Sequence, residues 1–202
     1  MLQLSTPEPI RDRRVRRSRS ALMRAAVDLV KERGTAALSI TDIAEAADVS
    51  RQVLYQQFGD RDTLLLEAAL DLVRNDLLTA LEEAPGEPGL DRATMLTSVR
   101  HFAEHRVFYR PLLTSASSYA LTNGLSTLFL PLYRQALQHL HGARLDADVI
   151  EDLATFAAGG VATLIKAWLV DVDDPLNPEQ FTDRLMRVIT VIARSPDGMA
   201  GA

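Results

Sequence analysis

Four polar side chains lie close together in the segment SRQVLYQQF, residues 50–58, and their types suit contacts to DNA bases. On a helix that turns by about 100° per residue, Leu54 and Phe58 fall on one side, and the polar residues fill an arc of roughly 140° on the other. These polar residues are Arg51, Gln52, Tyr55 and Gln56. Arginine pairs with guanine and glutamine with adenine in the major groove of B-DNA. The pattern predicts a helix that packs with one face and reads bases with the other.

A second short helical pattern precedes this segment and predicts the element that positions it. Ser39 is a candidate N-cap with Asp42 three residues later, and apolar residues over 40–47 form a two-turn stripe. Ser50 is a candidate cap for the following helix. Two short helices joined by a three-residue turn form a helix-turn-helix. A helical hairpin whose polar face is only solvated remains the alternative.

The charge is distributed unevenly along the 202 residues. Residues 1–61 carry 11 Lys and Arg against 8 Asp and Glu, whereas residues 62–202 carry 11 against 19. Six of the basic residues are arginines in RDRRVRRSR, residues 11–19. A basic segment on an otherwise acidic protein is a candidate contact surface for nucleic acid, and a solvated arginine tail is the alternative.

The remaining chain also shows helical periodicity, so the predicted fold class is all-α. A three-helix head is expected over 13–60, with the helix-turn-helix at about 39–58, and a larger helical body over 61–195. Disordered tails are expected at 1–12 and 196–202, and APGEPG at 84–89 is a linker. Helices are predicted at about 14–33, 39–47, 51–57, 61–83, 91–105, 107–117, 124–141, 147–171 and 177–194.

The stretch SITDIAEAADVSRQVLYQQFGDRDTLLLEAAL, with KERG before it, resembles the N-terminal domain of the TetR family of bacterial transcriptional regulators. The resemblance covers about residues 13–70, and over the body it extends only to the helical layout. Two positions depart from the family pattern. Asp48 stands where Gly is usual in the turn, and Asp tolerates the left-handed conformation better than most residues. Gln52-Val53 stands where Gly-Thr is common, which leaves the operator sequence open.

The resemblance implies roles for individual residues of the head. Base contacts are expected from the helix over 50–57, with Val53 near a thymine methyl and Tyr55 on a phosphate. Arg61 is expected on a phosphate, because it lies at a helix N-terminus, and a local surface ion pair is its alternative. The full set of expected DNA contacts is Arg14, Arg17, Ser39, Thr41, Ser50, Arg51, Gln52, Val53, Tyr55, Gln56 and Arg61.

The body holds most of the aromatic residues, and the resemblance implies that it encloses a small-molecule cavity. Core packing is the alternative for each aromatic residue taken singly. The expected ligand contacts are Phe102, Tyr109, Tyr119, Phe129, Tyr133 and Trp168. Leu72, Val73 and Leu77, on the long helix over 61–83, are expected to help line the cavity and to transmit ligand binding to the head.

Neither a metal site nor catalysis is indicated by the sequence. His101 and His105 lie one helical turn apart, with His139 and His141 further along, but no carboxylate falls at a convincing spacing and the chain has no cysteine. The chain contains neither a glycine-rich phosphate loop nor a nucleophile elbow. No cofactor is expected, and the protein is not expected to be an enzyme.

Small residues in FAAGGVATLIKAWL, residues 156–169, predict close packing of this helix and the last one against their copies in a two-fold dimer. Packing within one chain is the alternative. The expected interface residues are Ala157, Ala158, Gly159, Ala162, Thr163 and Ile189.

The combined interpretation is a cytoplasmic, homodimeric regulator of transcription. It is expected to be a repressor that a small-molecule inducer releases from a palindromic double-stranded DNA operator. The alternatives are an activator on the same scaffold, a helical lipid or acyl-chain binder without a DNA role, and, as a formal rival, an all-α enzyme. The start MLQLSTPEPI does not resemble a secretory signal, no window is expected to reach the apolar length of a membrane span, and no membrane contact is expected.

Overall fold

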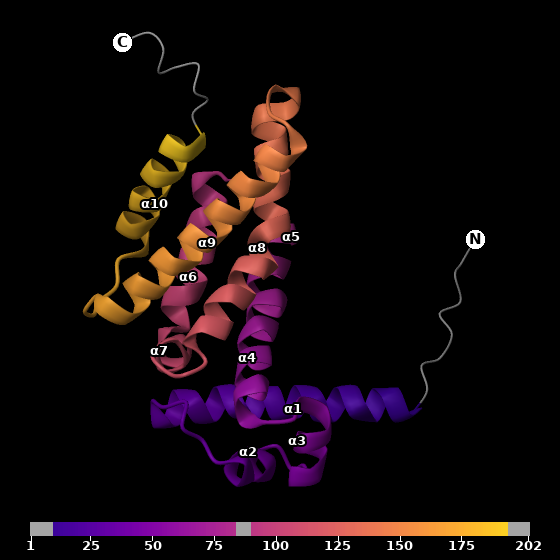
Figure 1. Cartoon of the computed structure of the whole chain (residues 1–202). Coiled ribbons are helices and arrows are strands. Elements are labelled where there is room, and N and C mark those ends of the chain that lie inside the picture. The colour runs from indigo at the N-terminus through magenta and orange to yellow at the C-terminus, as the bar shows by residue number, and fades with distance from the viewer. Residues whose placement is uncertain (1–9, 84–89, 194–202) are drawn as a thin grey trace. The chain divides into compact units, whose positions relative to one another are not determined.

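The computed structural model describes residues 10–83 and 90–193, and within these ranges every regular element is a helix (Figure 1). The chain forms two compact units that divide between Ala69 and Leu70. We call them the head and the body. This division lies nine residues after the predicted boundary at residue 60, within the fourth helix. The predicted tail at 196–202 and most of the tail at 1–12 lie outside the described residues.

The head consists of α1 (Ile10–Arg33), α2 (Ile40–Ala46), α3 (Arg51–Phe58) and the first part of α4 (Arg61–Leu72). In Figure 1, α2 and α3 lie together on one side of the long α1. The core is apolar, with Leu22, Ile43 and Leu54 fully buried. Helix α1 begins four residues before its predicted start, so the backbone of residues 10–12, expected in a tail, is helical.

The predicted helix over 61–83 contains a change of helix type. α4 continues into a π-helical segment, η1 (Val73–Leu78), and then into α5 (Thr79–Glu83). Val73, Leu77 and Leu81 are buried at intervals of four residues. On a regular α-helix, residues four apart are offset by roughly 40° around the helix axis. A π turn has more residues per turn, so it reduces this offset and keeps the three side chains closer to one face. Periodicity predicted this helix but not its local widening.

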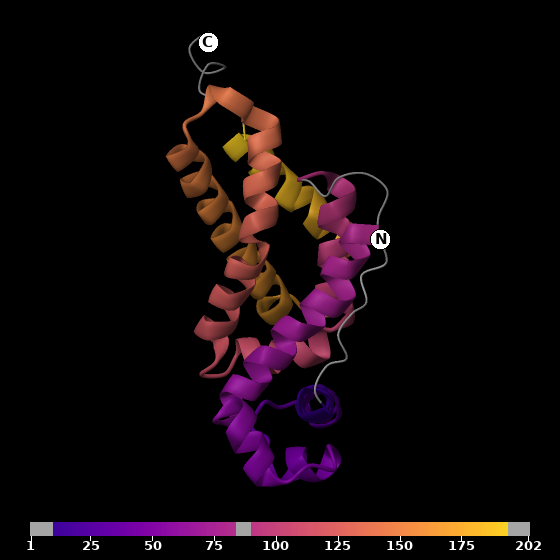
Figure 2. The ribbon, with the colours of Figure 1, turned by 90° about the vertical axis from the view of Figure 1, so that its right-hand side faces the viewer.

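The body contains α6 (Arg92–Glu104), α7 (Arg106–Leu113), α8 (Ser118–His141), η2 (Gly142–Arg144), α9 (Ala147–Asp171) and α10 (Pro178–Ala193). α8 packs along α9, α10 packs against α6, and α7 contacts both α8 and α9 (Figure 2). α8 begins six residues before its predicted start, since the Asn123-Gly124 pair, a turn signal in the sequence, lies inside the helix. Asp91 caps α6 by accepting hydrogen bonds from the amides of Ala93 and Thr94.

The expectation that no segment reaches the apolar length of a membrane span was wrong for α9. By length and composition this helix of 25 residues is apolar enough to cross a membrane. Its apolar character has an explanation within the body, because residues such as Ile150, Val161 and Leu169 are buried against neighbouring helices. A core helix passes the same test of length and composition.

Candidate nucleic-acid interface

Local hydrogen bonds position α2 and α3. The Ser39 hydroxyl accepts from the amide of Asp42 at 3.0 Å, and the Ser50 hydroxyl accepts from the amide of Val53 at 3.4 Å. Between the helices, Asp48 adopts a positive φ of 51°, the left-handed conformation predicted for it. The turn is closed by the amide of Val49, which donates to the carbonyl of Ala44 at 2.9 Å. The two serines, expected as DNA contacts, thus have capping roles in the chain itself.

Helix α3 has the two faces that its sequence predicts. Leu54 and Phe58 are buried, whereas the four polar residues of the opposite face are exposed. These four residues and the preceding serine line one shallow, open groove on the protein surface. Its lining residues are Ser50, Arg51, Gln52, Tyr55 and Gln56. Val53 is half-buried beside this face, and Thr41 is exposed on α2. The face offers the hydrogen-bonding groups of Arg51, Gln52 and Gln56 beside the exposed ring of Tyr55.

The arginine segment divides into two structural roles. Arg14 and Arg17 are exposed on α1. Arg19 instead donates from Nη1 to the carbonyl of Gln57 at 3.0 Å and pairs with Glu67 of α4. Nearby, the Gln57 side-chain amide donates to the Ser18 hydroxyl at 2.6 Å. Charge counting did not separate Arg19 from its neighbours, because its partners lie 38 and 48 residues away.

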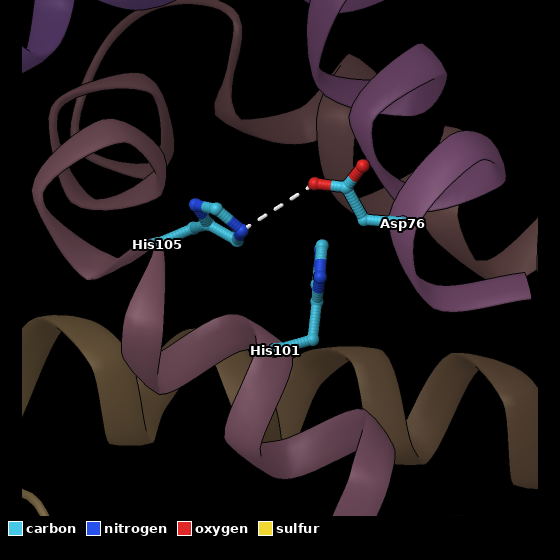
Figure 3. Close-up of side chains that lie close together, drawn as sticks. All are labelled: Asp76, His101 and His105. Carbon is cyan, nitrogen blue, oxygen red and sulfur yellow. Dashed lines mark ion pairs between the residues drawn. The ribbon is translucent and has the colours of Figure 1, made fainter. Parts of the chain in front are cut away.

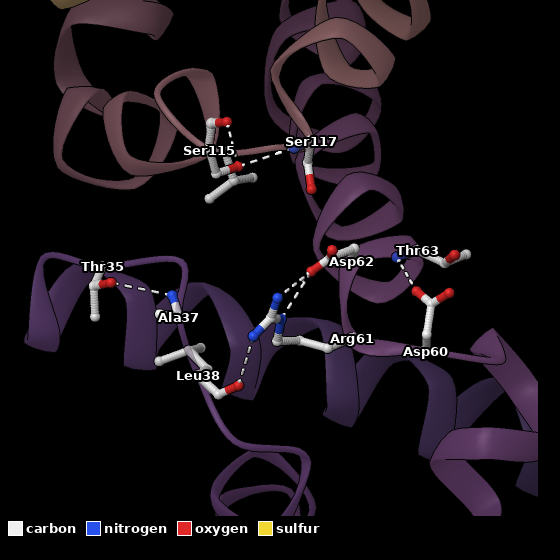
Figure 4. Close-up of polar contacts among 10 residues, drawn as sticks. Thr35, Ala37, Leu38, Asp60, Arg61, Asp62, Thr63, Ser115 and Ser117 are labelled. Carbon is white, nitrogen blue, oxygen red and sulfur yellow. Dashed lines mark hydrogen bonds and ion pairs between the residues drawn. The ribbon is translucent and has the colours of Figure 1, made fainter.

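Arg61 makes local contacts, which is the alternative that the sequence left open. Its Nε lies 2.8 Å from Oδ1 of Asp62, and its Nη1 donates to the carbonyl of Leu38 at 3.3 Å (Figure 4). Next to it, Asp60 caps α4 by accepting from the amide of Thr63 at 2.7 Å, and this hydrogen bond lowers the pKa of Asp60. A phosphate contact by Arg61 requires its guanidinium to give up part of this arrangement.

A second ion pair joins α1 to α2. Arg33 and Asp42 pair directly, and the hydrogen bond from Arg33, followed by that from the Ser39 hydroxyl, lowers the pKa of Asp42. Arg33 is exposed and Asp42 is half-buried, so the solvent-accessible pair contributes little to the stability of the fold.

The body contains a cavity between α6, α8 and α9. Three of the six predicted ligand residues, Phe102, Phe129 and Tyr133, line it. Its free volume is about 30 Å³, room for about one water molecule. Burial raises the pKa of Tyr133, so its hydroxyl remains protonated at neutral pH. The other lining residues, which the aromatic pattern could not identify, are Leu90, Thr94, Met95, Ser98, Leu125, Leu132, Ala158, Val161, Ala162 and Ile165.

The structure does not bring the other predicted residues to this cavity. Tyr109 is fully buried, and its hydroxyl lies 3.0 Å from Nε2 of His101. Tyr119 is 83% exposed, and Trp168 stacks on Phe181 of α10 with ring centroids 4.4 Å apart. Leu72, Val73 and Leu77 do not line it either, since its walls come from α6, α8, α9 and Leu90. Sequence composition located the aromatic residues without showing which way each one points.

The small residues of α9 face in two directions. Ala158 and Ala162 are buried and line the cavity inside the chain, which is the alternative of intrachain packing. The other four predicted interface residues line an open apolar groove between α9 and α10. They are Ala157, Gly159, Thr163 and Ile189. Phe156 and Val188 also line this groove and are 65% and 40% exposed, although the sequence analysis did not select them.

Comparison with known proteins connects this geometry to characterised families. A family model described as bacterial regulatory proteins, tetR family, matches residues 22–68, and one described as transcriptional regulator C-terminal region matches residues 93–191. The chain is 42% identical over 77 residues to the HTH-type transcriptional repressor Rv3405c of Mycobacterium tuberculosis. It shows the same identity to the HTH-type transcriptional regulator Mb3439c of Mycobacterium bovis. Each match spans 36% of this chain and 40% of the relative.

Solved structures share the fold over most of the chain. RolR in complex with the ligand resorcinol has a TM-score of 0.65 and 23% identity, covering 91% of this chain and 96% of RolR. The TetR family repressor AlkX from a Dietzia species has a TM-score of 0.58 and 22% identity, covering 86% of this chain and 96% of AlkX. At this identity the similarity establishes the all-α architecture of head and body.

Proposed function

Because the chain belongs to the TetR family of bacterial transcriptional regulators, we propose that it is a repressor that binds a palindromic operator as a homodimer and is released by a small-molecule ligand. The observation that carries this proposal is the exposed polar face of α3, supported by two capped helices and a left-handed turn. A helix of this kind fits the major groove, where Arg51, Gln52 and Gln56 have the side chains that discriminate guanine and adenine.

Positive charge on the head supports the same function. Arg14 and Arg17 are exposed on α1, which is in the same unit as α3. Contacts to phosphates supply affinity and orientation but no sequence preference, whereas contacts to base edges supply specificity. We therefore assign Arg14 and Arg17 to the DNA backbone, and Gln52 and Gln56 to bases.

The groove between α9 and α10 supports a homodimer. Its lining is mainly apolar and includes Phe156 and Val188, two large side chains that are exposed in the single chain. Contiguous exposed apolar surface in a monomer marks an interaction site. An isologous contact through this groove would give the two-fold symmetry that a palindromic operator requires.

The cavity supports a small, largely apolar ligand. Phe102, Phe129 and Tyr133 surround it, and polar groups are few. RolR, which has the same fold, binds resorcinol, and a small aromatic molecule also suits the chemistry of this lining. A free volume of about 30 Å³ is too small for an aromatic ring, so a ligand must select a wider form of the body. A ligand that releases DNA 100-fold must prefer that form by about 2.7 kcal/mol.

The proposal is tested by selecting genomic fragments of the source organism on the purified protein at low and moderate salt. We expect recovery of fragments that share an imperfect palindrome, with reduced reporter expression when the operator overlaps a promoter. The variant Gln52→Ala should lose the preference at one base pair of each half-site, while Gln135→Ala, a matched change on an exposed body position, should keep it. Failure to bind any duplex at low salt would favour the lipid or acyl-chain binder, and increased reporter expression would favour the activator.

A further inference from the structure

Two histidines and a carboxylate converge in the body. None of the three lines the cavity, although the His101 ring packs edge-on against Phe102, which does. Asp76 lies in η1, His101 lies in the last turn of α6, and His105 is the C-cap of that helix (Figure 3). One ligand-type atom from each residue lies within 4.8 Å of the other two. The sequence showed the two histidines but no carboxylate at a useful spacing, because Asp76 comes from a helix 25 residues earlier. The fold supplies the missing third group.

The local structure of both helices explains this arrangement. The His105 amide donates to the carbonyl of His101 at 3.1 Å, so the cap continues the helical turn and the two rings lie with centroids 4.8 Å apart. The π-helical segment keeps Val73 and Leu77 buried and presents Asp76, which is exposed, on the neighbouring side. Figure 3 shows the Asp76 carboxylate pointing toward His105 across the space between the two helices. π-helical turns of this kind occur frequently at functional sites.

The three side chains differ in burial in a way that suits ligand entry. His101 is 7% exposed, and the Tyr109 hydroxyl lies 3.0 Å from its Nε2. Burial, together with the charge of Asp76, raises the pKa of Tyr109, so the hydroxyl stays neutral beside the histidine. His105 is half-buried, and its Nε2 lies 3.6 Å from Oδ2 of Asp76. The site thus has a fixed inner group and a carboxylate that is open to solvent.

We propose that Asp76, His101 and His105 form a binding site for a divalent transition metal ion of the Zn²⁺ type. Imidazole nitrogen and carboxylate oxygen are the donors that such ions prefer, and three protein ligands leave a fourth position for water or another ligand. Metal-bound histidines normally use their second ring nitrogen in a hydrogen bond, and Tyr109 is placed to provide this for His101.

Ion binding requires only a small contraction of the site. Metal–ligand bonds of about 2.0–2.2 Å in tetrahedral geometry place neighbouring ligand atoms roughly 3.3–3.6 Å apart. The separation of 3.6 Å between His105 and Asp76 already has this size, and the largest separation in the triad is at most 4.8 Å. A bound ion would join η1 to α6 within the body.

The test uses the full-length protein after chelator treatment and dialysis. Titration with Co²⁺, followed by visible absorption, and with Zn²⁺, followed by calorimetry, should show one ion per chain. Asp76→Asn and His105→Gln should each weaken binding at least 10-fold, whereas His139→Gln, a change at an exposed histidine of α8, should leave it unchanged. Circular dichroism checks that each variant keeps its helical content.

A second readout separates a defined site from weak surface binding. Zn²⁺ should raise the thermal midpoint of the parent and of His139→Gln, but not that of Asp76→Asn. The proposal is overturned if the parent binds neither ion stoichiometrically. It is also overturned if both Asp76→Asn and His105→Gln keep the parent's affinity, or if His139→Gln weakens binding as strongly as they do.

Discussion

Arg19 holds its guanidinium 4.3 Å from the centroid of the Phe58 ring. The same group donates to the carbonyl of Gln57 and pairs with Glu67, so a single side chain of α1 contacts both the end of α3 and α4. Phe58 is buried on the inner face of α3, opposite the polar face. One arginine of the basic segment therefore stabilises the position of the helix that is proposed to enter the major groove.

Replacing Arg19 should destabilise the head. Arg19→Ala removes a cation–π contact and two polar contacts at once, so we expect a loss of about 1–3 kcal/mol in the free energy of unfolding. Urea denaturation followed by circular dichroism measures it. Arg17→Ala, at an exposed position of the same helix, is the matched control and should change stability by less than about 0.5 kcal/mol. Equal losses in the two variants would show that Arg19 has no special structural role.

Arginines of α1 and glutamines of α3 should affect DNA binding differently. Arg14→Ala and Arg17→Ala should weaken binding to all duplexes and reduce the salt slope by about one each. Gln52→Ala and Gln56→Ala should instead lose about 1–3 kcal/mol of discrimination at one base pair each. Fluorescence anisotropy on operator and random duplexes at several salt concentrations checks both. An unchanged salt slope in Arg17→Ala would place that side chain off the DNA backbone.

The turn before α3 should tolerate glycine but not a β-branched residue. Asp48 has a φ of 51°, a conformation that costs L residues about 1–2 kcal/mol relative to glycine. We expect Asp48→Gly to keep or slightly raise the thermal midpoint and to keep DNA affinity. Asp48→Val should lower the thermal midpoint, because a β-branched side chain is strained at positive φ. If Asp48→Val has the same thermal midpoint as Asp48→Gly, the left-handed backbone at this position does not limit stability.

The cap of α6 should make a pH-dependent contribution to stability. Hydrogen bonds from the Thr94 backbone, and then from its hydroxyl and the Ala93 amide, lower the pKa of Asp91 below its ordinary value of 3.8. A carboxyl group with a lowered pKa in the folded state stabilises the fold above its unfolded pKa, and this contribution is lost as pH falls through the folded value. Thermal midpoints of the parent should therefore fall below about pH 4.

Two substitutions isolate this effect. Asp91→Asn keeps a good capping group without a titrating carboxyl, so it should show a smaller acid-dependent fall than the parent. Asp91→Ala should lose about 1 kcal/mol at neutral pH. If Asp91→Asn and the parent have the same midpoint at every pH from 2 to 7, the carboxylate contributes nothing beyond hydrogen bonding.

The proposed dimer is tested best at Phe156. Ala158→Arg, at one of the interface residues expected from the sequence, would place a charge in the intrachain cavity and disturb folding. Phe156→Arg instead changes an exposed residue of the apolar groove and should give folded monomers in analytical ultracentrifugation. Tyr119→Arg, at an exposed aromatic residue outside the groove, should remain dimeric. A dimeric Phe156→Arg would place the interface on another surface.

The sequence by itself determined the helical class, the caps of α2 and α3 and the polar face of α3. The roles of Ser39, Ser50 and Asp48 depend on hydrogen bonds and backbone angles within a few residues, so local rules predict them. The faces of α3 follow from helical periodicity, which is also local. The all-α class and the order of head and body follow from the same regularities repeated along the chain.

Tertiary structure decided which chemically similar residues share a role. Arg19 is half-buried against α3 and α4, while Arg17 is exposed. Ala158 faces the cavity, while Gly159 faces the outer groove. The members of each pair are close in sequence. Asp76 meets His101 and His105 only because η1 and α6 pack together. Such contacts depend on the rotation and crossing of whole helices, and helix rotation is set by the sum of many packing interactions rather than by any short segment.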